Sequence, residues 1–218
     1  MLIGLTGGIG CGKTTVIKLF EELFKLNTYQ TDEIVHQILN FDKKVMMLLK
    51  ERWGEDIYLL DGGVDRKRIA ERVFGNKEEL KWLESVLHPR VRIAWKNSVA
   101  LKPNENHIVE IPLLFEKRLE KEFELIVCVS TSYELQIQRL KGRGISEAQA
   151  QARIRNQLPL SEKEQRADII IINNSFQNIL PCSRVHTSDR LIQQIKLSFT
   201  AHNKNELDLL LCSLGHGF

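Results

Sequence analysis

Short apolar runs alternate along this chain with longer stretches in which apolar residues recur every three or four positions. Strand-like runs fall at residues 2–6, 107–111, 125–129 and 168–172, with a shorter candidate at 28–31. Near-continuous apolar runs of this length are typical of strands that are covered on both faces. After the first run, helical spacing links Val16, Leu19, Phe20 and Leu23. The pattern predicts an α/β fold in which helices flank a parallel sheet.

The segment from about residue 33 to residue 102 interrupts this alternation. It is mostly helical in pattern and too long for one crossover connection, so we expect a helical substrate-binding insertion there. The length of 218 residues suits one α/β domain with such an insertion. We expect the core of this domain at about 1–32, 103–138 and 158–200, with one helix near 188–199.

The composition is that of an ordinary soluble surface. The net charge is +3, and 27% of the residues are charged, with the basic residues scattered along the chain. Such scattering does not indicate nucleic-acid binding. No apolar run is long enough for a membrane span, and the first residues enter a strand without a basic-then-apolar leader. We expect a monomeric cytoplasmic protein with neither nucleic-acid nor membrane partners.

One motif with specific chemistry lies between the first predicted strand and the first predicted helix. Residues 7–14 read GGIGCGKT, which matches the phosphate-loop pattern G-x-x-x-x-G-K-[ST]. Glycines let backbone N–H groups approach a phosphate, and the N-terminus of the helix adds partial positive charge. Lys13 would contact the β and γ phosphates, and Thr14 would offer its hydroxyl to Mg²⁺. The alternative is a glycine turn that leads into a helix and binds no phosphate. Such a turn would not need a lysine and a hydroxyl residue at these two positions.

The cysteines give one further expectation. Cys11, Cys128, Cys182 and Cys212 are too widely spaced for a zinc site or a redox pair. Cys128 lies in an apolar run and is interpreted as a small buried residue. Cys11 lies in the phosphate loop beside Lys13 and a helix N-terminus, which both favour thiolate, so we expect a lowered pKa and a reactive thiol there.

Two acidic residues come at the ends of predicted strands. Ligands of open α/β sheets bind at the carboxyl ends of the strands, so we expect Asp32 near the phosphate loop, where it can orient an acceptor hydroxyl and take its proton. The alternative for Asp32 is the N-cap of a helix that starts at Glu33. Glu110 can hold Mg²⁺ through water, and its alternative is an exposed strand end.

Residues 139–157 combine four arginines with glycines at 142 and 144. We expect this segment to be a glycine-hinged lid, in which Arg139 and Arg143 close over a triphosphate and exclude water. For Arg153 and Arg155, a solvated charged helix is an equally good interpretation.

Several motifs taken together resemble the dephospho-CoA kinase family. In chain order they are GLTGGIGCGKTT at 4–15, TDEIVHQIL at 31–39, WLESVLHPRVR at 82–92, EIPLLFE at 110–116, LQIQRL at 135–140 and RADIIIINN at 166–174. The resemblance covers about residues 1–175. It implies that ATP, with Mg²⁺, phosphorylates the ribose 3′-hydroxyl of dephospho-CoA in the last step of coenzyme A synthesis. It also implies a P-loop kinase fold with an ATP-binding core, a helical CoA-binding insertion and a lid.

The resemblance also implies roles for individual residues. Asp32 would be the catalytic base, while Lys13 and Arg139 would stabilise the transferred charge. Acceptor binding would fall to Asp32, His88, Arg92, Leu113, Leu114 and Phe115. Without the resemblance, His88 is a histidine that caps a helix before a proline. ATP would be bound by Gly8, Ile9, Gly10, Cys11, Gly12, Lys13, Thr14 and Thr15, together with Arg143 of the lid.

The chain departs from the family pattern at four positions, and other functions stay open on the residues alone. Gln30 stands in place of an acid, Glu110 in place of an aspartate, and Ile172 and Ser175 in place of an aspartate and a glycine. Another P-loop kinase would share the loop and the lid without needing the motifs at 82–92 and 110–116. A GTPase would need N-K-x-D, and the nearest match, at 203–206, ends in glutamate.

Overall fold

The computed structural model describes residues 1–59, 63–174 and 180–182. The chain forms two compact units. One comprises Met1–Thr28 and the described residues from Asn104 onward, and the other comprises Tyr29–Pro103. The insertion expected at 33–102 lies inside the second unit.

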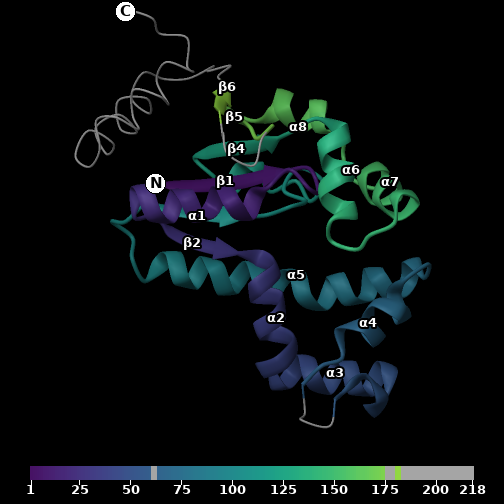
Figure 1. The fold of residues 1–218 in the computed structure, drawn as a ribbon. Helices are drawn as coiled ribbons and strands as arrows, with labels where there is room; N and C mark the ends of the chain where they lie inside the picture. Colours follow the sequence, from purple (N-terminus) through teal and green to yellow (C-terminus); the bar gives the residue numbers. More distant parts are fainter. Residues whose placement is uncertain (60–62, 175–179, 183–218) are drawn as a thin grey trace, which may run out of the picture. The chain divides into compact units, whose positions relative to one another are not determined.

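The first unit is built on a sheet (Figure 1). Its strand order is β2-β3-β1-β4-β5-β6. β1 pairs in parallel with β3 and β4, β4 pairs in parallel with β5, and β6 is antiparallel to β5. The strands are β1 (Leu2–Gly7), β2 (Asn27–Gln30), β3 (His107–Glu110), β4 (Leu125–Ser130), β5 (Ile169–Ile172) and β6 (Leu180–Cys182). The last two residues of β2 belong to the second unit.

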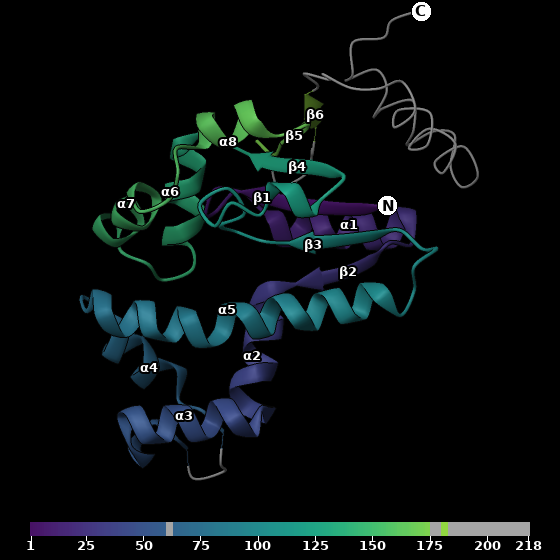
Figure 2. The ribbon, with the colours of Figure 1, turned by 180° about the vertical axis from the view of Figure 1, so that it is seen from behind.

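Helices flank this sheet. They are α1 (Lys13–Phe24), α6 (Tyr133–Lys141), α7 (Glu147–Arg155) and α8 (Leu160–Arg166), with a short 3-10 helix, η2 (Glu120–Glu122). α1 lies in front of the sheet in Figure 1 and behind it in Figure 2, so it covers one face. It packs on β1 and β3, whereas α8 packs on β1 and β4. Every residue of β4 is buried, which explains its unbroken apolar run.

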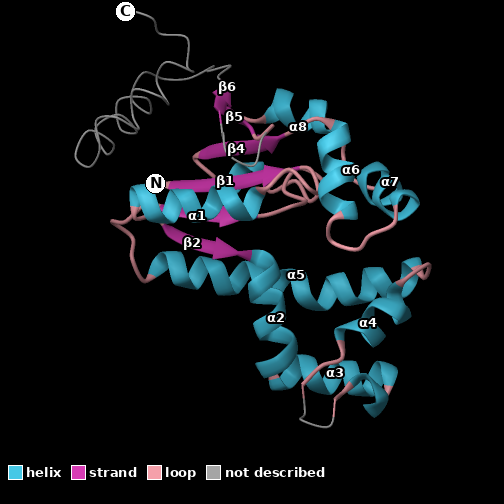
Figure 3. Ribbon diagram, viewed as in Figure 1, coloured by secondary structure: helices cyan, strands magenta, loops and turns pink. Residues whose placement is uncertain are grey.

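The described residues of the second unit are mainly helical (Figure 3). They also include the end of β2 and an isolated bridge between Tyr58 and Val64. Its helices are α2 (Thr31–Phe41), α3 (Lys43–Trp53), η1 (Glu55–Ile57), α4 (Arg66–Val73) and α5 (Lys77–Ala100). Side chains of Asp42, Asp65 and Asn76 cap the N-termini of α3, α4 and α5 by accepting N–H bonds from the first turn. The unit has its own core, which includes Leu39, Leu49 and Leu87.

The sequence predicted the architecture of the first unit well. The five strands are confirmed to within one residue at each end, as are the parallel sheet and its flanking helices. The sequence did not predict β6. The helix expected near 188–199 and the substituted Ser175 lie outside the described residues. Among the residues that the structure describes, no helix is both long and apolar enough to cross a membrane.

Candidate active site

The phosphate loop joins β1 directly to α1. β1 ends at Gly7 and α1 begins at Lys13, with Gly12 as the N-cap residue at φ 92°. A Cβ atom at Gly12 would lie 2.3 Å from Nδ2 of Asn173. Glycine is therefore required at position 12, because only glycine adopts this backbone conformation readily and leaves room for Asn173.

Two side chains hold carbonyl groups of the loop. Nη1 of Arg139, on α6, donates to the carbonyl oxygens of Gly10 and Cys11 at 3.2 and 3.3 Å. Nδ2 of Asn173, directly after β5, donates to the same Cys11 oxygen at 3.0 Å. In a planar trans peptide the C=O and the following N–H point in opposite directions. These bonds therefore direct the N–H of Gly12 away from Arg139 and Asn173.

Two glutamines that the sequence analysis did not single out contact Ile9. Nε2 of Gln136 donates to the Ile9 carbonyl oxygen at 2.8 Å, and the Ile9 N–H donates to Oε1 of Gln157 at 2.9 Å. Gln136 lies three residues before Arg139, within the LQIQRL motif. Helical spacing places residues three apart on the same face, so Gln136 could have been identified from Arg139.

Lys13 folds back over the loop that precedes it. Its Nζ donates to the carbonyl oxygens of Gly8 and Gly7 at 3.0 and 3.3 Å, and the residue is 9% exposed. Thr14 and Thr15 follow in the first turn of α1 and are exposed. An ammonium, hydroxyls and the N-terminus of a 12-residue helix thus lie in one short segment, which is chemistry suited to binding phosphate.

The expectation of a reactive thiol at Cys11 is wrong. Cys11 is fully buried in the core of the first unit. Burial raises the pKa of its thiol, and this effect exceeds the opposing influences of Lys13, a hydrogen bond with the Gly8 backbone and the side chain of Gln136. The structure confirms the interpretation of Cys128 as a buried residue, and burial raises the pKa of that thiol to about 12.

The end of β3 and the segment after it are more buried than the sequence indicated. Glu110 lies opposite Leu5 of β1 and is 7% exposed, so the interpretation as an exposed strand end is wrong. Leu114 and Phe115 are buried in the interior, where the Arg166 guanidinium covers the Phe115 ring. Neither has surface to offer an acceptor in this structure, contrary to the expectation from the motif. Leu113 is partly exposed.

A buried ion pair joins this segment to α8. Nζ of Lys163, a fully buried residue, lies 2.7 Å from Oε1 of Glu116 and donates to the Pro112 carbonyl oxygen at 3.0 Å. The same Glu116 oxygen accepts the N–H of Leu158 at 3.0 Å. One carboxylate therefore joins the segment after β3, the segment after α7 and α8.

The second unit carries the other expected site residues. Asp32 is the second residue of α2 and is exposed, while Gln30 is the N-cap residue, so the alternative of Asp32 as the N-cap is wrong. His88 and Arg92 are exposed and lie one turn apart on α5. His88 lies well inside this 24-residue helix, so its interpretation as a capping residue is also wrong.

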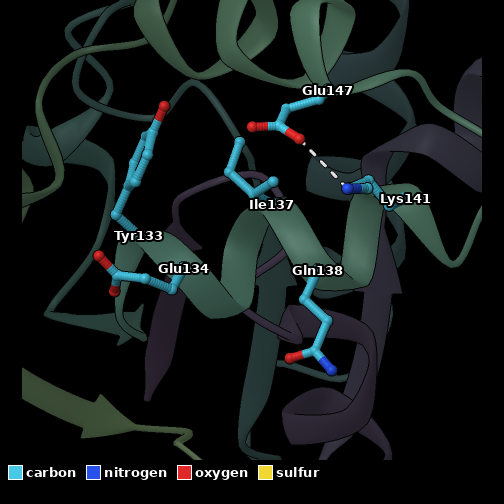
Figure 4. A pocket seen from close by; sticks show the side chains of 6 residues that line it. All are labelled: Tyr133, Glu134, Ile137, Gln138, Lys141 and Glu147. Carbon is cyan, nitrogen blue, oxygen red and sulfur yellow. Dashed lines mark hydrogen bonds and ion pairs between the residues drawn. The ribbon is translucent and has the colours of Figure 1, made fainter.

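A surface depression of about 430 Å³ lies over the outer side of α6 (Figure 4). Its lining is Tyr133, Glu134, Ile137, Gln138, Lys141 and Glu147, and Lys141 pairs with Glu147 at 3.1 Å. None of these residues was expected to bind phosphate. Arg143 is exposed in the turn after α6. The face of α6 that carries Gln136 and Arg139 contacts the phosphate loop instead.

Comparisons with known sequences all point to one family. The model of the dephospho-CoA kinase family matches residues 1–178. A dephospho-CoA kinase from Synechocystis is 36% identical over 175 residues, which cover 79% of this chain and 87% of the relative. A dephospho-CoA kinase from Fusobacterium nucleatum is 38% identical over 177 residues, covering 80% of this chain and 90% of the relative.

Solved structures show the same similarity. The crystal structure of TT1252 from Thermus thermophilus matches with a TM-score of 0.70 and 27% identity, covering 94% of this chain and 98% of that chain. Dephospho-CoA kinase from Campylobacter jejuni matches with a TM-score of 0.56 and 29% identity, covering 80% of this chain and 88% of that chain.

Proposed function

The chain belongs to the dephospho-CoA kinase family, and we propose that its phosphate loop binds ATP while Asp32 aligns the hydroxyl that is phosphorylated. The protein is an ATP-dependent kinase that converts dephospho-CoA to coenzyme A. In our proposal the accepting group is the ribose 3′-hydroxyl. The observation that carries the proposal is the geometry of the phosphate loop. Nζ of Lys13 is hydrogen-bonded to the Gly8 carbonyl oxygen of this loop. Arg139 and Asn173 both donate to the Cys11 carbonyl oxygen.

ATP binding falls to the loop and to the first turn of α1. The contacting residues in our proposal are Gly8, Ile9, Gly10, Cys11, Gly12, Lys13, Thr14 and Thr15. Lys13 and Arg139 stabilise the charge that develops on the transferred phosphoryl group. The Arg139 guanidinium is bonded to the Gly10 and Cys11 carbonyl oxygens, which keeps its positive charge at the loop. Arg143 adds a further contact from the lid.

Mg²⁺ fits the oxygen donors that the first unit offers. This ion takes most of its ligands from phosphates and water, so the protein needs to supply only one or two oxygens. Thr14 is exposed in the first turn of α1, and Glu110 ends the strand next to β1. Thr14 would be a ligand of the ion, and Glu110 would support it through water. The bound ion would neutralise charge between the β and γ phosphates.

The acceptor is bound by the second unit in our proposal. His88 and Arg92 offer two polar side chains on one exposed face of α5, and Asp32 offers an exposed carboxylate. Asp32 orients the acceptor hydroxyl and removes its proton as the phosphoryl group is transferred in line. Leu113, which is partly exposed, is a further acceptor-binding residue in our proposal.

The test is an assay of ADP release from ATP with dephospho-CoA as the only acceptor. Mass spectrometry should show one added phosphate, and ³¹P–¹H NMR should place it on the ribose 3′-oxygen. Lys13→Ala serves as the negative control for contaminating kinases. Release of ADP with another small alcohol, but not with dephospho-CoA, would favour a different P-loop kinase activity.

A further inference from the structure

The peptide groups on both sides of Ile9 are held by side chains. Gln136 is only 4% exposed, and its Nε2 contacts the Ile9 carbonyl oxygen at 2.8 Å. A Cβ atom at Gly8 would lie 2.4 Å from this Nε2, so the loop backbone packs directly on the carboxamide. Gln157, two residues beyond the end of α7, accepts the Ile9 N–H at 2.9 Å.

The bond from Gln136 sets the direction of a loop amide. The Ile9 carbonyl and the Gly10 N–H belong to one planar peptide group and point in opposite directions. Because the carbonyl faces Gln136, the Gly10 N–H is turned away from α6. A phosphate loop works through such N–H groups, so the orientation of this peptide matters for binding an anion.

The bond to Gln157 has a second consequence, which concerns Lys13. The Ile9 N–H shares its peptide plane with the Gly8 carbonyl, which therefore points away from Gln157. This Gly8 oxygen accepts the hydrogen bond from Nζ of Lys13 at 3.0 Å. Gln157 thus fixes the carbonyl that holds the Lys13 ammonium at the loop.

We propose that Gln136 and Gln157 are positioning residues for phosphoryl transfer, each of which fixes one peptide plane of the phosphate loop. Gln136 acts as a donor and Gln157 as an acceptor. The inference rests on the proposed role of the loop as the ATP site. Gln136 lies three residues before the expected lid, residues 139–157, and Gln157 is the last residue of that segment. The loop is therefore bonded just before the lid and at its end.

A first experiment tests the contacts without nucleotide or turnover. NMR hydrogen exchange of the Ile9 amide is measured in the full-length protein for the wild type, Gln157→Met and Gln157→Glu. The glutamate can still accept the hydrogen bond, whereas the methionine cannot. We expect exchange at least about tenfold faster in Gln157→Met and near the wild-type rate in Gln157→Glu. Equal exchange in the wild type and Gln157→Met would overturn the proposal, whatever the enzyme phosphorylates.

A second experiment tests the positioning role in catalysis. Gln136→Met and Gln157→Met keep the length of the side chain and remove its hydrogen bonds. We expect kcat/KM for ATP to fall about tenfold in each, with KM for the acceptor little changed. Gln136→Glu should resemble Gln136→Met, because an ionised carboxylate cannot donate to a carbonyl.

The matched controls are Gln138→Met on the outer side of α6 and Gln151→Met on α7, which should keep wild-type kinetics. Thermal unfolding of every variant separates loss of fold from loss of positioning. If Gln136→Met does not fold, the partly exposed Gln157 still decides the kinetic test. Wild-type kinetics in a folded Gln157→Met protein would refute the positioning role.

Discussion

The Nζ atom of Lys13 lies 3.0 Å from the carbonyl oxygen of Gly8 in the loop that Lys13 itself completes. The residue is 9% exposed, so the ammonium is largely shielded from water and donates to carbonyl oxygens of the loop. A phosphate oxygen is a stronger acceptor for an ammonium because it is charged. ATP therefore meets a lysine that is already held at the loop.

From this contact we expect Lys13→Ala to remove most activity. Loss of a charge contact that stabilises the transition state costs about 2.7 to 4 kcal/mol, which is a hundredfold or more in kcat. Steady-state kinetics with dephospho-CoA provides the measurement. Lys18→Ala removes the same charge from an exposed position of α1 and should change kcat little. Near-normal turnover in a folded Lys13→Ala protein would contradict the assignment of the active site.

Asp32→Asn tests the proposed base. We expect kcat to fall roughly 10²- to 10⁴-fold with ATP affinity nearly unchanged, since asparagine cannot take a proton. ATP affinity can be measured by isothermal titration calorimetry and kcat by the coupled assay.

The neighbouring Glu33 gives a control for the charge of Asp32. Both residues lie in the first turn of α2, where either carboxylate stabilises the helix dipole by about 0.3 to 1 kcal/mol. Glu33→Gln should therefore cost similar stability but at most a few-fold in kcat. Equal kcat values for Asp32→Asn and Glu33→Gln would leave Asp32 with a structural role only.

Sequence reasoning succeeded where the physical cause is local. The strands were predictable because a strand that is buried on both faces requires apolar residues at successive positions, as in β4. The phosphate loop was predictable because its glycines, Lys13 and Thr14 must follow one another in the chain.

Sequence reasoning failed where distant segments decide the environment. The neighbours of Cys11 in the chain favour thiolate, but Gln136 and the core close over its sulfur and raise its pKa instead. The family motif implies that Leu114 contacts the acceptor, yet its side chain packs against Gly4 of β1 in the interior. The bond between Gln157 and Ile9 spans 148 positions, which no local pattern reports.

Breaking the ion pair between Lys163 and Glu116 by removing one partner should destabilise the first unit strongly. Lys163→Met leaves the Glu116 carboxylate, 18% exposed, without its cation. We expect a loss of about 3 kcal/mol or more in the free energy of unfolding in urea. Lys163→Met combined with Glu116→Leu should recover part of this loss, because no unpaired charge then stays buried.

An exposed ion pair provides the comparison. Lys141 and Glu147 are 3.1 Å apart, with side chains that are 55% and 56% exposed. Lys141→Met should change the free energy of unfolding by no more than about 1 kcal/mol. If Lys163→Met and Lys141→Met lower the free energy of unfolding by similar amounts, burial does not explain the cost of breaking the Lys163 pair.

The Cys128 thiol should make stability depend on alkaline pH. Its pKa is 9.0 when unperturbed and about 12 in the folded protein, where burial raises it. Above pH 9 the unfolded chain therefore loses this proton while the folded chain keeps it, so stability falls as the pH rises towards 12. By pH 11 this proton linkage should lower the free energy of unfolding by about 2.7 kcal/mol, since each of the two pH units above 9 costs about 1.36 kcal/mol. The measurement is the difference in unfolding free energy between the wild type and Cys128→Ala, which should shrink from pH 8 to pH 11. A constant difference would contradict the shifted pKa.

The size of the second unit predicts selectivity for a large acceptor. Residues 29–103 form a separate helical unit, which is far more structure than phosphate capture requires. Binding energy from a remote part of the acceptor can be used to align the hydroxyl, so truncated acceptors should lose kcat as well as affinity. We expect dephospho-CoA to exceed adenosine and AMP by at least about 10²-fold in kcat/KM, which corresponds to ~3 kcal/mol expressed in the transition state. Arg92→Ala should lower kcat/KM for dephospho-CoA but not for AMP, so the ratio between the two acceptors should fall. Lys13→Ala should lower kcat/KM for both acceptors by the same factor. Efficient phosphorylation of AMP or shikimate by the wild-type protein would instead identify a kinase for small acceptors.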